Sequence, residues 1–175
     1  PENEKWREIF LKEFNDKIQV LPFVEYYSNT IDVTRLTEII AELPVGYEIR
    51  RLDSRLCQKL TGEIPNEGFF EAFYNVDDFL KRGIGFCVLN NDKKIVSAAT
   101  SMAASRNAID IEIETVRSMR RKGLGTIVGA KLVLYCIHNN IEPKWLAANR
   151  DSEKLAARLG FSKGKRYETF QIGVV

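Results

Sequence analysis

Histidine and cysteine are scarce in this chain of 175 residues, which contains one histidine and three cysteines. Cys57, Cys87 and Cys136 lie in apolar surroundings and form no C-x-x-C pair, so we expect neither a disulfide framework nor a zinc site. The longest apolar run, residues 127–137, is interrupted by Lys131 and is too short to span a bilayer. No signal-peptide pattern opens the chain. These absences predict a soluble, cytoplasmic protein that holds no metal.

An excess of charge of one sign is also missing. The chain has 26 basic and 24 acidic residues, which gives a net charge of +2. This balance argues against a general nucleic-acid-binding protein and gives more weight to any local cluster of cations. With 45% hydrophobic residues, a chain of this length can form one compact domain, with or without a small extension.

One such cluster lies in residues 115–126, which join an alternating strand at 109–114 to an apolar helix that ends near residue 138. Gly123 and Gly125 open the helix. Four cations crowd the same turn: Arg117, Arg120, Arg121 and Lys122. Because a helix N-terminus already carries unpaired N–H donors and about half a positive charge, four cations there are unfavourable unless an anion lies among them.

The segment therefore predicts a cradle for a phosphate-bearing ligand, with the backbone N–H groups from Arg121 to Thr126 as donors. The alternative is an ordinary strand-to-helix turn with surface cations. A phosphate-binding loop of the nucleoside triphosphatase type would need G-x-x-x-x-G-K-[ST], and a dinucleotide-binding turn would need a glycine at Val128. The pattern that fits is R-x-x-G-x-G, filled by Arg120, Gly123 and Gly125.

In this order and spacing, the motifs resemble the GNAT superfamily of acetyl-CoA-dependent N-acyltransferases. The R-x-x-G-x-G helix is followed by a strand that ends near Asn149, then by Ser152 and the run Leu-Gly-Phe at 159–161. More narrowly, four segments are similar to the zwittermicin-resistance-like acetyltransferases: 111–115, 120–125, 142–145 and 149–152. The resemblance covers about residues 45–175. It implies an acyltransferase with an α+β fold, a GNAT-type mixed and mostly antiparallel central sheet flanked by helices.

The resemblance also implies what the protein binds. Acetyl-CoA is the expected cosubstrate, and a primary amine of a small molecule is the expected acceptor. The family allows a homodimer, whereas neither nucleic acid nor a membrane is an expected partner. The positions implied to contact acetyl-CoA are Ile113, Glu114, Thr115, Val116, Arg120, Arg121, Lys122, Gly123, Leu124, Gly125, Thr126, Asn149 and Ser152. Within this set, residues 113–116 map to the strand end that donates a backbone N–H to the acetyl carbonyl, and the alternative role for Asn149 is a helix cap.

A general base is expected on the strand at 109–115. Strand periodicity places isoleucines on one face and Asp110, Glu112 and Glu114 on the other. Three carboxylates on one face can bind a cationic amine and take its proton, directly or through water. We favour Glu112 or Glu114 over Asp110. The alternative is an ordinary solvated strand face.

The sequence departs from the family at the general acid. GNAT enzymes often carry a tyrosine seven residues after the asparagine that matches Asn149, and this chain has Ala156 there. The role of general acid then falls to another group such as Tyr167, to water, or to no group at all. Two other functions therefore stay open. One is a non-catalytic coenzyme-A-binding sensor, and the other is a protein-interaction domain in which residues 1–45 are the working part.

Periodicity and turn residues predict the order of the elements. We expect helices at 4–14, 32–43, 54–60 (capped by Ser54) and 152–159, short amphipathic turns at 69–73 and 76–80, and strands at 47–52, 86–91, 94–101, 144–148 and 167–174. Residues 1–45 are expected to be a helical N-terminal extension, the remnant of a longer N-terminal part. Residues 46–175 are expected to be the GNAT acetyltransferase domain.

Overall fold

The computed structural model describes residues 4–173, apart from the side chains of Asp16, Glu67 and Tyr167. Its strands form one seven-stranded sheet in the order β2-β3-β4-β5-β6-β1-β7. Neighbouring strands are antiparallel except β5 and β6, which are parallel. The strands are β1 (Ile18–Tyr27), β2 (Glu48–Arg51), β3 (Gly85–Leu89), β4 (Ile95–Ala104), β5 (Ala108–Thr115), β6 (Glu142–Ala147) and β7 (Ser162–Ile172). The expected mixed, mostly antiparallel sheet is confirmed.

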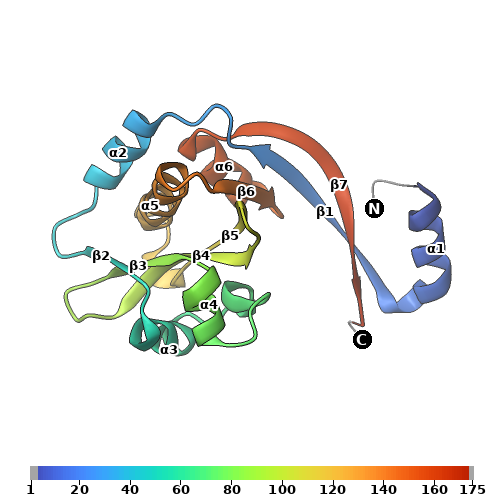
Figure 1. Ribbon diagram of the computed structural model, residues 1–175, viewed down its shortest axis with the longest axis horizontal. Coiled ribbons are helices and arrows are strands. Elements are labelled where there is room, and N and C mark those ends of the chain that lie inside the picture. The colour runs from blue at the N-terminus through green and yellow to red at the C-terminus, as the bar shows by residue number, and fades with distance from the viewer. Residues whose placement is uncertain (1–3, 174–175) are drawn as a thin grey trace.

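Helices cover both faces of this sheet. Helices α2, α5 and α6 lie on one face, and α3 and α4 lie on the other (Figure 1). None of the helices described is both long and apolar enough to cross a membrane. The helices are α1 (Glu4–Phe14), α2 (Val33–Ala41), α3 (Ser54–Glu63), α4 (Val76–Arg82), α5 (Leu124–His138) and α6 (Arg150–Leu159), with short 3-10 helices η1 (Asn15–Lys17), η2 (Glu67–Phe70) and η3 (Arg117–Met119).

Most predicted elements are present, with shifted ends. The alternating strand and the apolar helix after it are β5 and α5. The cap of α3 is Asp53 rather than Ser54, because the Asp53 carboxylate accepts the Leu56 N–H at 2.8 Å. The last strand begins at Ser162, five positions before the predicted start at residue 167.

The expectation that residues 1–45 are helical is wrong for residues 18–27. These residues form β1, which lies between β6 and β7 and is antiparallel to both. Val24 is opposite Ala147 on one side and Arg166 on the other. Residues near the start of the chain therefore complete the sheet that carries the predicted site.

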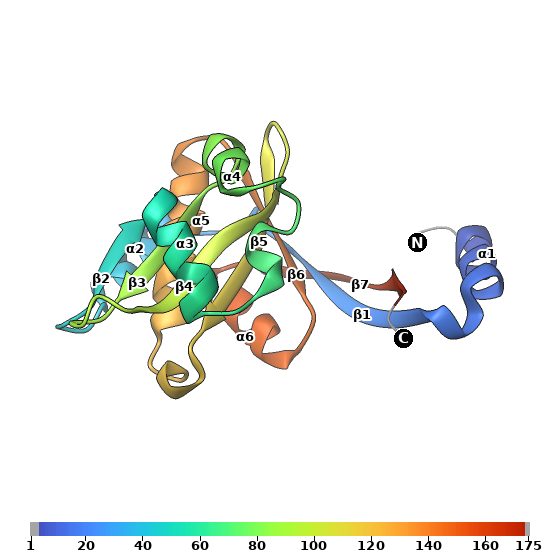
Figure 2. The same ribbon diagram turned by 90° about the horizontal axis from the view of Figure 1, so that it is seen from below.

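The far halves of β1 and β7 leave the body of the molecule as a two-stranded ribbon that ends at α1 (Figures 1 and 2). Helix α1 has no buried residue. It contacts the ribbon through Phe10, whose ring stacks on that of Phe170 at 5.9 Å between centroids.

Helix α5 is the centre of the core on its face of the sheet. Val128, Leu132 and Val133 are fully buried. The isoleucines of β5 face the same side, where Ile111 and Ile113 pack against the buried clusters around α5. This arrangement agrees with the predicted alternation of β5 and leaves its carboxylates on the opposite face.

The position of β1 can be tested with two Val→Pro substitutions in the first 45 residues. Val24→Pro removes an N–H from a strand that is paired on both sides, and an unpaired carbonyl alone costs roughly 1–3 kcal/mol. Val33→Pro lies at the first position of α2, after the cap Asp32, where proline is tolerated. Chemical denaturation should show a large loss of stability for Val24→Pro and little change for Val33→Pro. Equal, small effects would contradict the role of β1 in the sheet.

Candidate functional site

Strands β5 and β6 separate after a short stretch of pairing. Parallel partners are recorded only for Ala108 with Glu142, Ile109 with Pro143 and Asp110 with Lys144. From Trp145 onward β6 pairs with β1 on its other edge. The facing edges of β5 and β6 beyond these pairs are therefore left without ladder partners in the described part of the sheet. Such a gap gives an extended ligand access to backbone donors and acceptors in the sheet plane.

The direction of the N–H groups at the end of β5 decides which of them reach this gap. The Val116 N–H donates to Val96 C=O at 3.0 Å and so faces β4. The Thr115 N–H faces the other way and donates to the Glu114 carboxylate at 2.8 Å. Alternation along the strand then directs the Glu114 N–H to β4 and the Ile113 N–H to the gap. Of the four positions predicted to donate to an acetyl carbonyl, Ile113 is the one whose N–H faces the gap and is open.

The turn and the start of α5 lie at the same edge as the open end of the gap. Gly123 caps α5 in the left-handed conformation, with φ of 80°. The Ile127 N–H donates to Gly123 C=O at 3.0 Å, so the N–H groups of the three preceding residues are the free donors of the first turn. A Cβ on Gly125 would lie 3.1 Å from Thr115 Oγ1, which shows how closely the helix start approaches the end of β5.

The four cations of the turn have different environments. Arg120 is committed to the protein, because its guanidinium donates to Glu114 Oε1 at 2.9 Å and to Thr115 C=O at 3.1 Å. Arg117, Arg121 and Lys122 are exposed, and no ion pair with a described carboxylate is formed by any of them. A Cβ on Gly123 would meet no atom within 4 Å. Three cations without an ion pair among the described residues, of which Lys122 contacts Met119 Sδ at 3.4 Å, lie beside free N–H donors and open space at Gly123, and this set fits a diphosphate group.

The start of α6 lies near the same end of β6. Asn149 Oδ1 accepts the N–H groups of Asp151 and Ser152, both at 3.0 Å, so its oxygen serves as the cap of α6. Ser152 Oγ accepts the indole N–H of Trp145 at 3.0 Å. Trp145 is buried in the core, as are Phe69 and Phe73. Contact of Asn149 or Ser152 with a coenzyme remains a prediction.

The carboxylate face of β5 is not a solvated surface. Asp110, Glu112 and Glu114 are all half-buried, because η2 covers this face. A Cβ on Gly68 would lie 3.3 Å from Glu112 Cδ. Burial raises the pKa of Glu112, opposed by a hydrogen bond from Asn66 Nδ2 to Glu112 Oε1 at 2.8 Å. Burial likewise raises the pKa of Asp110, opposed by Lys144.

Glu112 and Glu114 differ in their hydrogen-bond partners. Glu114 Oε1 accepts both the Arg120 guanidinium and the Thr115 N–H, so a cation compensates its charge. Glu112 has a neutral partner, Asn66, and a raised pKa. Glu112 is therefore better suited than Glu114 to accept a proton. Asn66 was not among the predicted site residues.

The general acid is not supplied by Ala156. Its side chain is fully buried in the cluster that also contains Leu36, Ala130 and Phe161, so a tyrosine there would overpack the core. The Tyr167 side chain lies outside the described residues. Its backbone is part of β7 and pairs with Phe23 of β1. Strand β1 separates β7 from β6.

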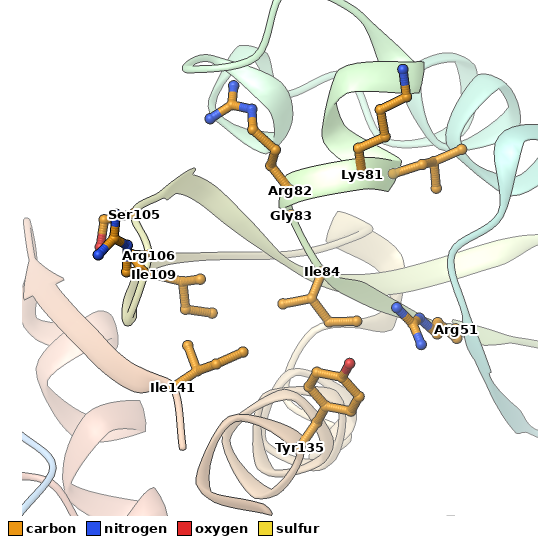
Figure 3. A pocket seen from close by; sticks show the side chains of 11 residues that line it. Arg51, Lys81, Arg82, Gly83, Ile84, Ser105, Arg106, Ile109, Tyr135 and Ile141 are labelled. Carbon is orange, nitrogen blue, oxygen red and sulfur yellow. The ribbon is translucent and has the colours of Figure 1, made fainter. Parts of the chain in front are cut away.

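A second hollow, of about 220 Å³, lies near the other end of α5 (Figure 3). Its floor is apolar and its rim is basic, with Arg51, Lys81, Arg82 and Arg106. Lys81 and Arg82 point away from the floor in Figure 3, and Arg82 is paired with Asp78. Arg51 lies over the Tyr135 ring at 5.3 Å. These cations do not converge on one point, so this hollow is not a candidate for the anion site.

The gap between β5 and β6, the cationic turn after β5 and the carboxylate face of β5 together suit the transfer of an acyl group. Comparisons with known proteins agree. The model of the GNAT acetyltransferase family matches residues 1–170. The uncharacterized N-acetyltransferase YdfB of Bacillus subtilis is 31% identical over 135 residues, which cover 75% of this chain and 51% of YdfB. The chain therefore belongs to the GNAT acetyltransferase family, and it spans about half the length of this curated relative.

Two solved structures are similar in fold. A GCN5-related N-acetyltransferase-like protein from Streptococcus suis superposes with a TM-score of 0.88 at 26% identity, over 98% of this chain and 69% of that one. A GCN5-related N-acetyltransferase from Kribbella flavida gives a TM-score of 0.64 at 13% identity, over 94% of this chain and 62% of that one. Members of this family use acetyl-CoA as the acetyl donor, and the turn after β5 has the donors to hold its diphosphate.

The cradle can be tested with Gly123→Glu. The new carboxylate would lie among the donors expected to bind the diphosphate, and like charges placed together cost several kcal/mol. Titration calorimetry with acetyl-CoA should show affinity at least roughly 100-fold weaker, or about 2.8 kcal/mol. Gly173→Glu is the matched control, because Gly173 also has a positive φ, of 92°, and open space around its Cα. Unchanged affinity in a folded Gly123→Glu variant would contradict the cradle.

Proposed function

We propose that this protein transfers an acetyl group from acetyl-CoA to the primary amine of a small molecule. The observation that carries the proposal is the gap between β5 and β6. The Ile113 N–H opens into it, the cationic helix start borders it, and Glu112 lies on the same strand. Acyl transfer requires an anchor for the donor, polarisation of its carbonyl and a base for the amine. Candidate groups for all three lie along β5 and the turn that follows it.

Acetyl-CoA supplies an activated acetyl group as a thioester. The free N–H groups at the start of α5, with Arg117, Arg121 and Lys122, would hold its diphosphate. The Ile113 N–H would donate to the acetyl carbonyl oxygen, where negative charge develops during attack. Glu112 would accept a proton from the ammonium form of the acceptor, directly or through water. The neutral amine nitrogen then bonds to the carbonyl carbon, the carbon–sulfur bond breaks, and the nitrogen releases its second proton to water. The thiolate takes a proton from solvent.

The absence of a phenol at Ala156 does not require the sensor function. A coenzyme A thiol is acidic enough to leave without a strong acid, so acetyl transfer is compatible with a solvent proton. Asp110, Glu112 and Glu114 support a cationic amine as the acceptor, because three half-buried carboxylates on one face attract positive charge.

Three finer points belong to the same proposal. We propose that the chain is related within its family to the zwittermicin-resistance-like acetyltransferases. We also propose that it works in the cytoplasm, where its three buried, unpaired cysteines would stay reduced. Finally, we propose that residues 46–175 carry the catalytic groups. Residues 1–45 are then an N-terminal extension that contributes strand β1 to the sheet.

The base assignment predicts a pH-dependent defect in Glu112→Gln. An amine screen that follows thiol release supplies an acceptor. With it, turnover at neutral pH should fall by roughly 10²–10⁴. The loss should shrink at high pH, because the amine is then neutral without a base. In the wild type the rate should fall as the pH drops through the raised pKa of Glu112, since a protonated carboxyl group cannot accept a proton.

Glu114→Gln is the matched control for this experiment. It removes an ion pair that is partly exposed on both sides, and such pairs contribute about 0–1 kcal/mol. We expect turnover within about tenfold of the wild type. A larger defect in Glu114→Gln than in Glu112→Gln would assign the base to Glu114.

A further inference from the structure

Asn66 joins the short helix η2 to the carboxylate of Glu112. Its Oδ1 accepts the Gly68 N–H at 2.9 Å and so caps η2. Its Nδ2 donates to Glu112 Oε1 at 2.8 Å. Because the amide has one acceptor end and one donor end, each end has its own partner, and the cap fixes the direction of the donor.

The helix η2 is itself held in place against the sheet. The Thr100 hydroxyl, which is fully buried, donates to Phe69 C=O at 3.0 Å. Thr100 is the register partner of Glu112 across β4 and β5. A Cβ on Gly68 would lie 3.2 Å from Asn66 Oδ1 and 3.3 Å from Glu112 Cδ, so a side chain there would press on both groups of the hydrogen bond. The Asn66 amide therefore has little freedom to move away from Glu112.

The arrangement leaves one oxygen of Glu112 available. The described residues offer no hydrogen bond to Oε2. Oε2 is therefore the oxygen that the described residues leave for an acceptor amine or a bridging water.

The charges around Glu112 are mostly negative. Asp110 and Glu114 lie on the same face of β5, and Glu71 follows η2. Arg120 pairs with Glu114, and Lys144 acts on Asp110. Asn66 is therefore the group in the described structure that directly stabilises the ionised form of Glu112.

We propose that Asn66 is a positioning residue for acetyl transfer, which holds Oε1 of Glu112 so that Oε2 faces the acceptor amine. The inference rests on the proposed function, in which Glu112 is the base. By donating to the carboxylate, Asn66 also keeps Glu112 ionised at lower pH than its burial alone would allow.

The variant that separates this role from helix capping is Asn66→Asp. Aspartate is as good a cap as asparagine, but it replaces the donor with a second carboxylate. The acid limb of kcat/KM should move to higher pH by about one unit or more, with a loss of about tenfold on that limb and recovery at high pH. Asn66→Ser, which keeps a cap without adding charge, should shift the limb in the same direction by less.

Asn75→Asp is the matched control. Asn75 caps α4 by accepting the Asp78 N–H at 2.9 Å and has no contact with Glu112. Its substitution should leave the pH profile unchanged. Equal shifts for Asn75→Asp and Asn66→Asp, or no shift for Asn66→Asp, would overturn the positioning role.

A second readout does not depend on turnover. Carbon-13 NMR of labelled glutamate side chains, with the Glu112 signal identified by its loss in Glu112→Gln, gives the titration midpoint of Glu112 directly. We expect a higher midpoint in Asn66→Asp and Asn66→Ser than in the wild type or in Asn75→Asp. An unchanged midpoint overturns the inference. If Glu112→Gln turns over like the wild type, the base assignment in the proposed function fails, and with it the part that Asn66 would play in catalysis, whatever the midpoint.

Discussion

The site depends on the separation of β5 from β6. Two parallel strands that stayed paired would use the N–H and C=O groups on their facing edges in the ladder. Here pairing ends at Asp110 and Lys144, while β6 stays in the sheet because β1 pairs with its other edge from Trp145 to Ala147. Residues 145–147 have their recorded ladder partners on the β1 edge. A strand near the start of the chain thus holds β6 in the sheet beside a candidate site that is built mainly from residues 108–152.

The turn after β5 places the proposed anion site at the end of this gap. Gly125 lets the start of α5 lie against Thr115, so the free N–H groups of the helix are close to the end of the strand. Arg120 ties the turn back to β5 through Thr115 and Glu114. The arginine of the R-x-x-G-x-G pattern thus stabilises the turn, and the cations left for a ligand are its neighbours in sequence. A motif residue can act through loop geometry as well as through contact.

The elements that the sequence predicted well are those with a local pattern. The alternation of β5 and the apolar stretch of α5 depend on neighbouring residues alone. β1 was not predicted, because Pro22 interrupts an otherwise apolar run and its partners come from residues 145–147 and 162–172. Pro22 lies where β1 pairs with β7 alone, at an edge where a missing N–H is tolerated. The bond between Asn66 and Glu112 spans 46 positions, so no local pattern could predict it.

The same limit applies to the two glutamates. Periodicity places Glu112 and Glu114 on one face, two residues apart, and cannot distinguish them. Tertiary contacts do: the turn brings Arg120 to Glu114, and η2 brings Asn66 to Glu112. A cation compensates Glu114, which would otherwise repel a diphosphate bound at the adjoining turn. A neutral amide holds the Glu112 carboxylate in place without adding charge. In the proposed reaction the ion pair supports the anchor and the amide supports the base, so two identical side chains on one strand take different parts.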